Sequence, residues 1–467
     1  MKLIYGIKDK PRFSEVIVFA IQQLLAIMAA TLVVPVIING NISGMIAEGS
    51  LSWTLDKPMS STVALFGAGV GTLVYLLFTK FRSPVFLGSS FAFLGSMTAA
   101  FAGASSMALG YVGLILGAVC AGLVYVVIAI IVKFAGVKWI NKLMPAVVIG
   151  PTVTIIGLSL AGNAIGDLQT APAGGDSKVA LICGLVTLAV TIICSVYGKK
   201  MMKLIPFIMG ILAGYAVAAI FTVIGNAAGI DALKVINFSS FEALWADGIG
   251  LKTFITLPEF TFLNALGGFK EINGSYIATV AVAYVPVAFV VFAEHLADHK
   301  NISSIIESDL LEDPGLHRTL LGDGVGSMAG AIFGGCPNTT YGESVGCVAI
   351  TGNASVITIV TTAFAAIAIS FLSPFVAFVN SIPSCVMGGV CMALYGFIAV
   401  SGLKMVQKVD LEHNANLFTV SVILIAGIGG LTISFGQVSI TSIACALILG
   451  ILTNVLVNKS RKSDKLD

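Results

Sequence analysis

The sequence predicts an all-α polytopic membrane protein, and three observations lead to this fold class. Of the 467 residues, 57% are hydrophobic and only 10% are charged. The mean hydropathy is +1.01, so a water-soluble chain of this length would lack the polar surface to cover its core. Apolar windows of about 20 residues, the length that crosses a bilayer as a helix, recur from Val16 to Val457 with short breaks. These breaks leave no room for a separate soluble domain.

The apolar runs and their breaks predict fourteen transmembrane segments. Two of them, 84–100 and 338–352, are short and interrupted by Gly and Pro, and hydropathy alone would miss them. The expected segments are 14–38, 60–79, 84–100, 108–133, 139–161, 178–197, 204–224, 274–298, 318–335, 338–352, 355–378, 383–402, 415–432 and 437–457.

The distribution of basic residues predicts that both termini are cytoplasmic. With the N-terminus inside, twenty of the 25 Lys and Arg residues fall in cytoplasmic segments, as the positive-inside rule requires. This agreement needs both weak segments to cross the membrane, or neither of them. The start, Met1 to Arg12, is too polar for a signal peptide and is expected to be a cytoplasmic tail.

The longest loop, 225–273, divides the segments into seven and seven, which predicts two inverted repeats. With an odd number of segments in each half, the second half begins from the opposite side of the membrane. The two broken segments are then the third member of each half, and SPVFLGSSFAF (83–93) and CPNTTYGESVG (336–346) share an extended, Pro-containing stretch. We expect these stretches, in segments 3 and 10, to pair as short β-strands, because unwound backbone at membrane depth must find internal partners.

Two carboxylates lie well inside apolar segments and predict the substrate site. Glu294 lies in AYVPVAFVVFAEHLADH (283–299), and Glu343 follows the extended stretch PNTTY, whereas nearly all other acidic residues fall in tails, loops or segment ends. A carboxylate at bilayer depth costs several kcal/mol unless it is paired, protonated or beside a polar cavity, so it indicates function by default. The alternative is a structural carboxylate that caps a broken helix or bonds a neighbouring segment. Asp298, one turn after Glu294, is either a proton relay or a helix-end charge.

The half-helices expected from about Phe91 and Gly342 would direct free N–H groups towards the cavity centre, where a ligand carbonyl could bind. The alternative is that the glycines of the two broken segments only permit close helix packing. No Lys or Arg lies at that depth, which favours a neutral, hydrogen-bonding substrate over an anion. A carboxyl that is neutral when buried and ionised when opened to the cytoplasm can carry a proton.

Other polar residues in the segments give weaker signals. Either Gln22 or Gln23 could face the cavity or bond a neighbouring helix. His295 points about 100° away from Glu294 and is expected to be a packing residue, while His299, like His317 and His413, is expected to be solvated in a cytoplasmic stretch. The eight Cys lack metal-ligand spacing, so no disulfide, metal or cofactor is expected. No basic patch suited to nucleic acid is present in the sequence.

At these residues the sequence resembles the nucleobase/ascorbate transporter family, and within it the bacterial uracil permeases. The resemblance runs nearly end to end and includes QQLLAIMAATLVVPVI (22–37), FLGSSFAF (86–93), FAEHLADH (292–299), DLLEDPGLHR (309–318), CPNTTYGESVGCVAITG (336–352) and MGGVCMALYGFIAVSGLK (387–404). The family signature of an acid or Gln, then Asn, any residue, Gly, four residues and Thr corresponds to Glu343, Ser344, Val345, Gly346 and Thr351.

The resemblance implies a core domain of segments 1–4 and 8–11 (14–133 and 274–378) and a gate domain of segments 5–7 and 12–14 (139–224 and 383–457), with a homodimer formed through the gate. It also implies roles for site residues. Glu294 and Glu343 would hydrogen-bond the base, and the backbone N–H groups of Phe91 and Gly342 its carbonyls. Tyr341 and Ser90 would line the pocket, Gln23 would contribute from the first segment, and Tyr395 would close the pocket from the gate side.

Three departures from the family pattern stand at the same site. Ser344 replaces the usual Asn, which is expected to loosen the network beside Glu343. Gln23 and Asp298 stand where uracil permeases often have His. The replacement at Asp298 puts the proton relay in question and weakens the preference for uracil over xanthine.

We therefore expect a proton-coupled symporter that imports a nucleobase, uracil, across the bacterial inner membrane, with Na⁺ as an open alternative to H⁺. The second hypothesis is a permease for xanthine, guanine or another purine. A channel or anion exchanger of the same fold would require a basic residue at the cavity centre, and the missing Lys or Arg at that depth counts against it. An intramembrane enzyme is the least favoured, because no catalytic constellation appears at depth.

Overall fold

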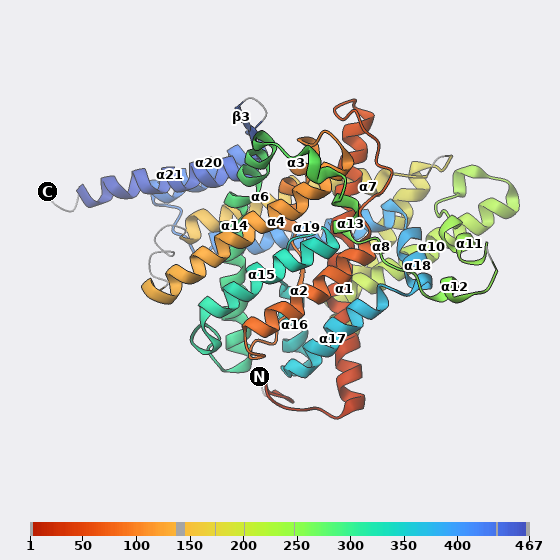
Figure 1. Cartoon of the computed structure of the whole chain (residues 1–467), viewed down its shortest axis with the longest axis horizontal. Helices are drawn as coiled ribbons and strands as arrows, with labels where there is room; N and C mark the ends of the chain where they lie inside the picture. The colour runs from red at the N-terminus through yellow and green to blue at the C-terminus, as the bar shows by residue number, and fades with distance from the viewer. Residues whose placement is uncertain are drawn as a thin grey trace.

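The computed structural model describes residues 3–136, 145–172, 174–199, 201–246, 248–435 and 438–463. The chain is mostly helical, and two pairs of short strands interrupt the helices (Figure 1). Residues 139–144 of the expected fifth segment and residue 437 of the last lie outside the described residues. Among the described residues, eight helices are long and apolar enough to cross a membrane.

The first half of the chain contains most of the elements expected from hydropathy. Its elements are α1 (Phe13–Ala47), α2 (Ser61–Phe78), β1 (Leu87–Ser89), η1 (Phe91–Phe93), α3 (Leu94–Ala102), α4 (Met107–Ala135), α6 (Ala146–Ser159), α7 (Ala161–Gln169), α8 (Ser177–Tyr197), α9 (Met201–Leu204) and α10 (Pro206–Ala228). The long loop that follows contains short helical pieces that the sequence did not predict: η2 (Asp231–Leu233), α11 (Ser239–Trp245), α12 (Leu251–Phe254), α13 (Thr261–Ala265) and η3 (Gly268–Glu271).

The second half has the same kind of elements, again with a strand followed by a half-helix in its third segment. They are α14 (Gly274–Ile306), the π-helical turn η4 (Leu311–Gly315), α15 (Leu316–Gly334), β2 (Asn338–Thr340), α16 (Gly342–Thr351), α17 (Val356–Ile369), α18 (Ser373–Ser381), α19 (Ser384–Val406), α20 (Asn414–Ile428), β3 (Ile433–Phe435), β4 (Val438–Ile440) and α21 (Ser442–Ser463). The expected segment 355–378 is wrong as one helix, because α17 ends at Ile369 and α18 begins anew with Pro374 in its first turn, where its fixed φ is tolerated.

The expected strand pair is confirmed. β1 and β2 are antiparallel, with Leu87 opposite Thr340 and Ser89 opposite Asn338. Gly335 ends α15 with a φ of +75°, a left-handed conformation that glycine adopts without a Cβ clash, and the chain then continues extended into β2. All six strand residues are buried, so each strand satisfies the other's backbone groups where water cannot.

The helices pack in two groups. α2 packs on α15 and α17, α15 on α4, and α4 on α14, whereas in the second group α19 packs on α6, α7 and α8, α8 on α10, and α20 on α6 and α21. Glycines permit the closest approach: a Cβ added to Gly67 of α2 would lie 2.4 Å from the carbonyl oxygen of Gly330 in α15. Small residues at helix contacts let backbones approach in lipid, where burial of apolar surface gives no association.

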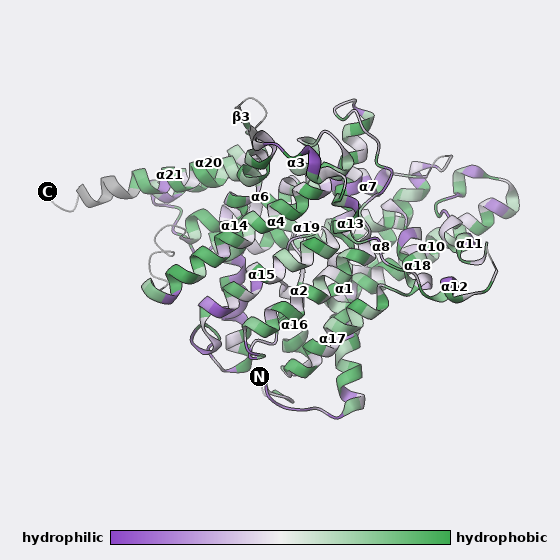
Figure 2. Cartoon of the chain, viewed as in Figure 1, coloured by the Kyte–Doolittle hydropathy of each residue, from purple (hydrophilic) through white to green (hydrophobic). Residues whose placement is uncertain are grey.

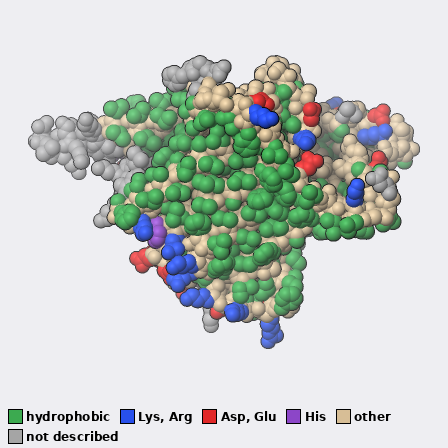
Figure 3. All heavy atoms as spheres, viewed as in Figure 1, with side chains coloured by type: hydrophobic (Ala, Val, Ile, Leu, Met, Phe, Trp, Pro, Cys, Tyr) green, Lys and Arg blue, Asp and Glu red, His purple; other side chains and the backbone are tan. Residues whose placement is uncertain are grey.

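The outer surface matches a bilayer solvent. The helices are apolar along most of their length and the hydrophilic residues gather towards helix ends and loops (Figure 2). One face carries a broad apolar surface bordered by charged side chains at its edges (Figure 3). Exposed side chains such as Leu123, Val127, Ile192 and Ile220, between 49% and 59% exposed, would be unfavourable in water but suit acyl chains.

Candidate functional site

A cavity of about 390 Å³ lies where α14, the two broken segments and α19 meet. Six of the expected site residues line it: Phe91, Glu294, Asp298, Tyr341, Gly342 and Glu343. The remaining wall comes from Ala92, Val153, Ile156, Phe207, Val290, Ala297, Thr339, Thr340, Leu394, Phe397, Ile398, Ser401 and Met405. Its size and its few convergent polar groups in an apolar lining are typical of a small-molecule site.

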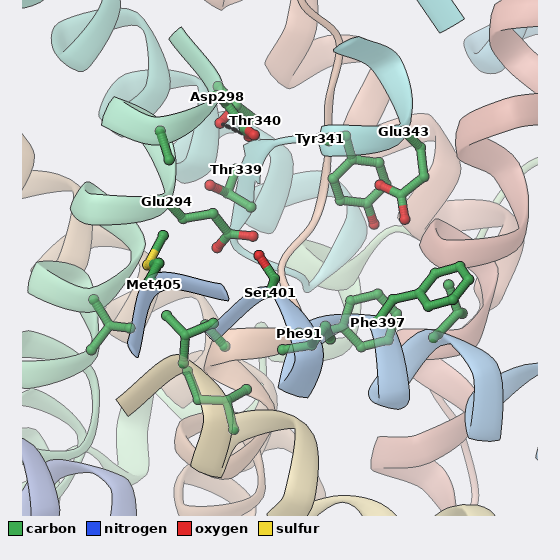
Figure 4. Close-up of a pocket in the computed structure, with 18 of the residues that line it drawn as sticks. Phe91, Glu294, Asp298, Thr339, Thr340, Tyr341, Glu343, Phe397, Ser401 and Met405 are labelled. Carbon is green, nitrogen blue, oxygen red and sulfur yellow. Dashed lines mark hydrogen bonds between the residues drawn. The ribbon is translucent and has the colours of Figure 1, made fainter. Parts of the chain in front are cut away.

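Glu294 and Asp298 line the cavity from the same helix. They are one turn apart on α14, which runs from Gly274 to Ile306 without a break, so both project from one face. Asp298 is bonded at its Oδ2 by the hydroxyl of Thr340, which donates over 2.8 Å and thereby ties α14 to β2. Glu294 points towards the middle of the labelled side chains, with Ser401 of α19 across from it (Figure 4). Glu294 is therefore the more available of the two carboxyl groups.

The strand pair places two half-helices at the cavity. The Ser90 N–H donates to the Pro337 carbonyl over 2.9 Å, and the Tyr341 N–H to the Phe86 carbonyl over 3.3 Å, so the pairing continues beyond the strands themselves. Directly after it, η1 begins at Phe91 and α16 at Gly342. The first N–H groups of a helix have no acceptor within that helix, and they carry the positive end of its dipole. Glu343 lies in the first turn of α16, on the same cavity wall.

Tyr341 is held in a single position behind this wall. Its hydroxyl donates to the Ser89 carbonyl over 2.6 Å. Gly88 leaves the space for its ring, because a Cβ at that position would lie 2.3 Å from two of the ring carbons. The ring is 4% exposed, so Tyr341 contributes a small edge to the cavity and mainly supports its wall.

Three expected site residues lie behind the cavity wall. Gln23 of α1 donates from Nε2 to the Ser344 Oγ, which also accepts the Phe86 N–H over 3.0 Å. Two of the positions that depart from the family pattern, Gln23 and Ser344, are thus bonded to each other. Ser90 is buried, and Tyr395 of α19 is buried with its ring edge against Phe91 at 6.1 Å between centroids. The residues of α19 that line the cavity are instead Leu394, Phe397, Ile398, Ser401 and Met405.

A second buried polar cluster lies on the neighbouring face of α14, and the sequence did not predict it. Asp323 of α15 is 1% exposed and accepts from His295 Nδ1 at 2.7 Å, while His295 Nε2 lies 3.0 Å from the Thr319 hydroxyl. Asp323 was not among the acidic residues that the sequence analysis singled out, yet it is buried within α15. Its position between Gly322 and Gly324 in α15, which pack against α2 and α4, was the available signal.

The expectation that His299 is solvated was also wrong. Its side chain is fully buried, its Nδ1 bonds the His295 carbonyl at 2.9 Å, and its Nε2 lies 2.7 Å from the Tyr75 hydroxyl. The stretch is a continuation of α14, and α2 covers it. On α14 the carboxyl pair Glu294/Asp298 thus faces the cavity, while the histidine pair anchors the helix to α2 and α15.

Comparison with known proteins gives a consistent result. The profile of a family described as the Permease family matches residues 14–435. The chain is 37% identical to the uracil permease of Bacillus caldolyticus, covering 98% of this chain and 95% of that protein. It is 34% identical to the uracil permease of Bacillus subtilis strain 168, over 99% and 97%. For the uracil permease of Escherichia coli strain K12 the identity is 34%, over 96% and 92%.

Solved structures of membrane transporters share the fold. The transmembrane domain of a cyanobacterial bicarbonate transporter, BicA, matches with a TM-score of 0.55 at 14% identity, covering 96% of this chain and 99% of that one. The inward-facing murine Solute Carrier 26 family member A9 anion transporter matches with a TM-score of 0.63 at 11% identity, over 97% and 69%. At such low identity the likeness concerns the fold alone. The relatives in sequence are permeases, which confirms the expectation of a transporter that is not an enzyme.

Proposed function

The chain belongs to the nucleobase/ascorbate transporter family, and from this premise we propose that it is a proton-coupled symporter that imports uracil by alternating access. The observation that carries the proposal is the cavity lined by both Glu294 and Glu343, with Glu343 in the first turn of the half-helix that begins at Gly342. Uracil is flat and neutral and alternates N–H donors with carbonyl acceptors around its ring. Carboxyl groups accept from the donors and helix N-termini donate to the carbonyls.

Each site residue has a proposed role. Glu294 binds the base and carries the coupling proton, and Asp298 relays that proton along α14. Glu343 fixes the orientation of the base, while the Phe91 and Gly342 N–H groups bind its carbonyls. The supporting residues are Tyr341 and Ser90 behind the strand pair, Gln23 through Ser344, and Tyr395 through its contact with Phe91.

An anion is less well suited to this cavity. Among the described residues that line it there is no Lys or Arg, and three carboxyl groups would repel a second negative charge. The structural neighbours named as bicarbonate and anion transporters therefore share the fold, while the chemistry of the cavity points elsewhere.

We propose fourteen spans arranged as two inverted repeats, with the core domain formed by 14–133 and 274–378 and the gate domain by 139–224 and 383–457. The two groups of packed helices and the matching strand-then-half-helix units support this division. Both termini would lie in the cytoplasm of a bacterial cell with the chain in its inner membrane, and two copies would associate through their gate domains. The gate would rock against the core around the bound base.

The coupling proton can drive considerable accumulation. One proton moving inward across 100 mV supplies about 2.3 kcal/mol, which corresponds to roughly fifty-fold accumulation of the base.

We expect Glu294→Gln to abolish uphill uptake of labelled uracil in energised vesicles, because an amide cannot take up and release the proton. Counterflow exchange of uracil against uracil, which needs no net proton movement, should fall less. Retention of proton-driven accumulation in this variant would rule out Glu294 as the carrier. Imposing a Na⁺ gradient in place of the proton gradient, in the unmodified protein, tests the other coupling ion.

A purine permease is the second candidate, because Asp298 departs from the pattern of uracil permeases. Competition of labelled uracil uptake by unlabelled uracil, xanthine and guanine separates the two. Inhibition by uracil at concentrations at least tenfold below those of either purine supports the pyrimidine, and the reverse order supports the purine.

A further inference from the structure

A second cavity, of about 410 Å³, lies at the end of the bundle where α1 ends and α14 begins. Its lining residues are Asn41, Phe91, Leu94, Gly95, Thr98, Ala99, Ala102, Ile156, Ser159, Leu160, Asn163, Thr432, Ile440, Thr441, Ser442 and Ile443. They come from α1, from η1 and α3, from α6 and α7, and from the β3–β4 region with the start of α21.

The proposed repeat relates this cavity to the one that contains Glu294. In an inverted repeat of seven spans, the first span corresponds to the eighth, the third to the tenth, the fifth to the twelfth and the seventh to the fourteenth. The Glu294 cavity is lined by α14, α16, α19 and α10, which are the eighth, tenth, twelfth and seventh spans, and also by Phe91 and Ala92 of the third span and Val153 and Ile156 of the fifth. The second cavity is lined by the first, third, fifth and fourteenth. An inverted repeat places the opening to the opposite side of the membrane at this location.

The two cavities meet at a thin barrier. Phe91 and Ile156 line both of them. The Phe91 ring also rests edge-on against Tyr395, at 6.1 Å between ring centroids. A base that moved from one cavity to the other would therefore need only these side chains to shift.

A chain of side-chain hydrogen bonds crosses the second cavity from gate to core. Asn163 of α7 donates from Nδ2 to the Asn41 Oδ1 over 2.8 Å, and Asn41 of α1 donates from its own Nδ2 to the Thr98 hydroxyl over 3.0 Å. These bonds use one N–H of each amide, and an amide carries two. The amide edges of Asn41 and Asn163, in an otherwise mainly apolar cavity, suit the paired N–H and C=O edge of a neutral heterocycle.

We propose that this cavity is the outer access site of the transporter, that Asn41 and Asn163 bind the incoming nucleobase there, and that their mutual hydrogen bond closes the site while the Glu294 cavity is open. The inference rests on the proposed function for the identity of the base. The direct bond between the two amides must break before either amide edge can pair with a ligand, so binding and opening are one event.

Another cavity at the same end serves as an internal control. It has a volume of about 860 Å³ and is lined by Asn39 and Ser43 of α1, by residues of α2, by Asp167 and by Asn380 of α18. Phe91 and the residues of α3 are not in its wall as the described residues form it, so it has no direct path to the Glu294 cavity. A substitution at Asn380 should therefore leave access to the site unchanged.

The test measures access from the outer side with a cysteine reporter. Ser159→Cys places a thiol in the wall of the second cavity, and right-side-out vesicles are treated with a membrane-impermeant maleimide, with the chain lacking the reporter as background. We expect Asn163→Ala to accelerate modification of the reporter at least threefold, because the closing bond is lost, and Asn380→Ala to leave the rate within about 1.5-fold. Uracil should slow modification, and Asn41→Ala should raise the half-protecting uracil concentration about three- to tenfold, as for one lost neutral hydrogen bond.

Failure of this inference can be told apart from failure of the proposed function. The assignment of the outer site is overturned if the chain without these substitutions accumulates uracil but Asn163→Ala leaves the rate of maleimide labelling unchanged. It is also overturned if Asn380→Ala accelerates the labelling instead. If uracil neither is accumulated nor protects the reporter, yet Asn163→Ala still accelerates modification, the access route stands and uracil is the wrong substrate. Asn163→Asp, of the same size, replaces Asn163→Ala if that variant fails to reach the membrane.

Discussion

The cavity that contains Glu294 has two walls of different chemistry, one from the proposed core domain (the core wall) and one from the proposed gate domain (the gate wall). The core wall presents Glu294, Asp298, Glu343 and the side chains of Thr339 and Thr340. The gate wall presents Val153, Ile156, Phe207, Leu394, Phe397, Ile398 and Met405, with Ser401 as its hydroxyl. Directional bonds on one side can hold a base in one orientation, while an apolar surface can slide past it without breaking such bonds. The difference supports the proposal that selectivity belongs to the core wall and movement to the gate wall.

The strongest test after Glu294→Gln concerns Glu343, a second carboxyl group of the core wall. We expect Glu343→Gln to raise the KM for uracil about ten- to a hundredfold, because hydrogen bonds to charged groups contribute about 1.5–3 kcal/mol. Uptake at saturating uracil should still respond to the proton gradient, since Glu294 is intact. The measurement is initial uptake over a range of uracil concentrations at two external pH values.

Glu343→Asp is the matched control for this variant, because it keeps the charge and shortens the reach by one methylene. An unchanged KM in both variants would show that Glu343 does not bind uracil. Loss of the pH response with an unchanged KM would show that Glu343, and not Glu294, carries the coupling proton.

A medium effect is expected at Ser344, which supports the core wall without facing the base. Ser344→Ala removes the acceptor shared by Gln23 and the buried Phe86 N–H. Leaving a buried donor without a partner costs about 1–3 kcal/mol, so we expect a lower unfolding temperature in detergent and a severalfold higher KM.

The control for Ser344→Ala is Thr361→Ala, at a partly exposed site where the hydroxyl donates to the Ile357 carbonyl of its own helix. Equal shifts of the unfolding temperature in the two variants would show that the Ser344 hydroxyl does not join α1 to the strand pair.

The smallest effect is expected on the gate wall. Ser401→Ala removes its hydroxyl, and if selectivity resides in the core, the KM for uracil should change less than about threefold, below the value of one typical hydrogen bond. Inhibition of uptake by xanthine should also be unchanged. A tenfold rise in KM, or a new preference for a purine, would break the division between the two walls.

The sequence predicted the broken segments well because their chemistry is local. Pro, Gly and extended residues at 83–90 and 336–341 cannot continue a helix in lipid, and the structure pairs them as β1 and β2 before two half-helices. Glu294 and Glu343 were equally visible, since each is a carboxylate surrounded by apolar neighbours in the chain, and both line one cavity.

The positions that the sequence did not resolve depend on partners far away in the chain. His299 is covered by Tyr75, 224 residues before it, and Gln23 meets Ser344, 321 residues after it. A hydropathy window reports how apolar a stretch of the chain is. It does not report which way the resulting helix is rotated about its axis. It could therefore not tell that Gln23 points at a neighbouring helix, or that Asp323 faces His295.

The sequence alone determined that this chain is a helical membrane protein with carboxyl groups inside apolar segments, because a long, weakly charged apolar chain has few other stable forms, and its resemblance to a known family identified a transporter. Only the tertiary structure decided which polar groups face the cavity and which hold the helices together. That choice is made by the packing of α14 against α4, α3 and α16, and by the bonds of its histidines to Tyr75 of α2 and Asp323 of α15. Rotating such a helix by one residue, about 100°, would bring His295 and His299 to the cavity in place of Glu294 and Asp298 without changing its hydropathy.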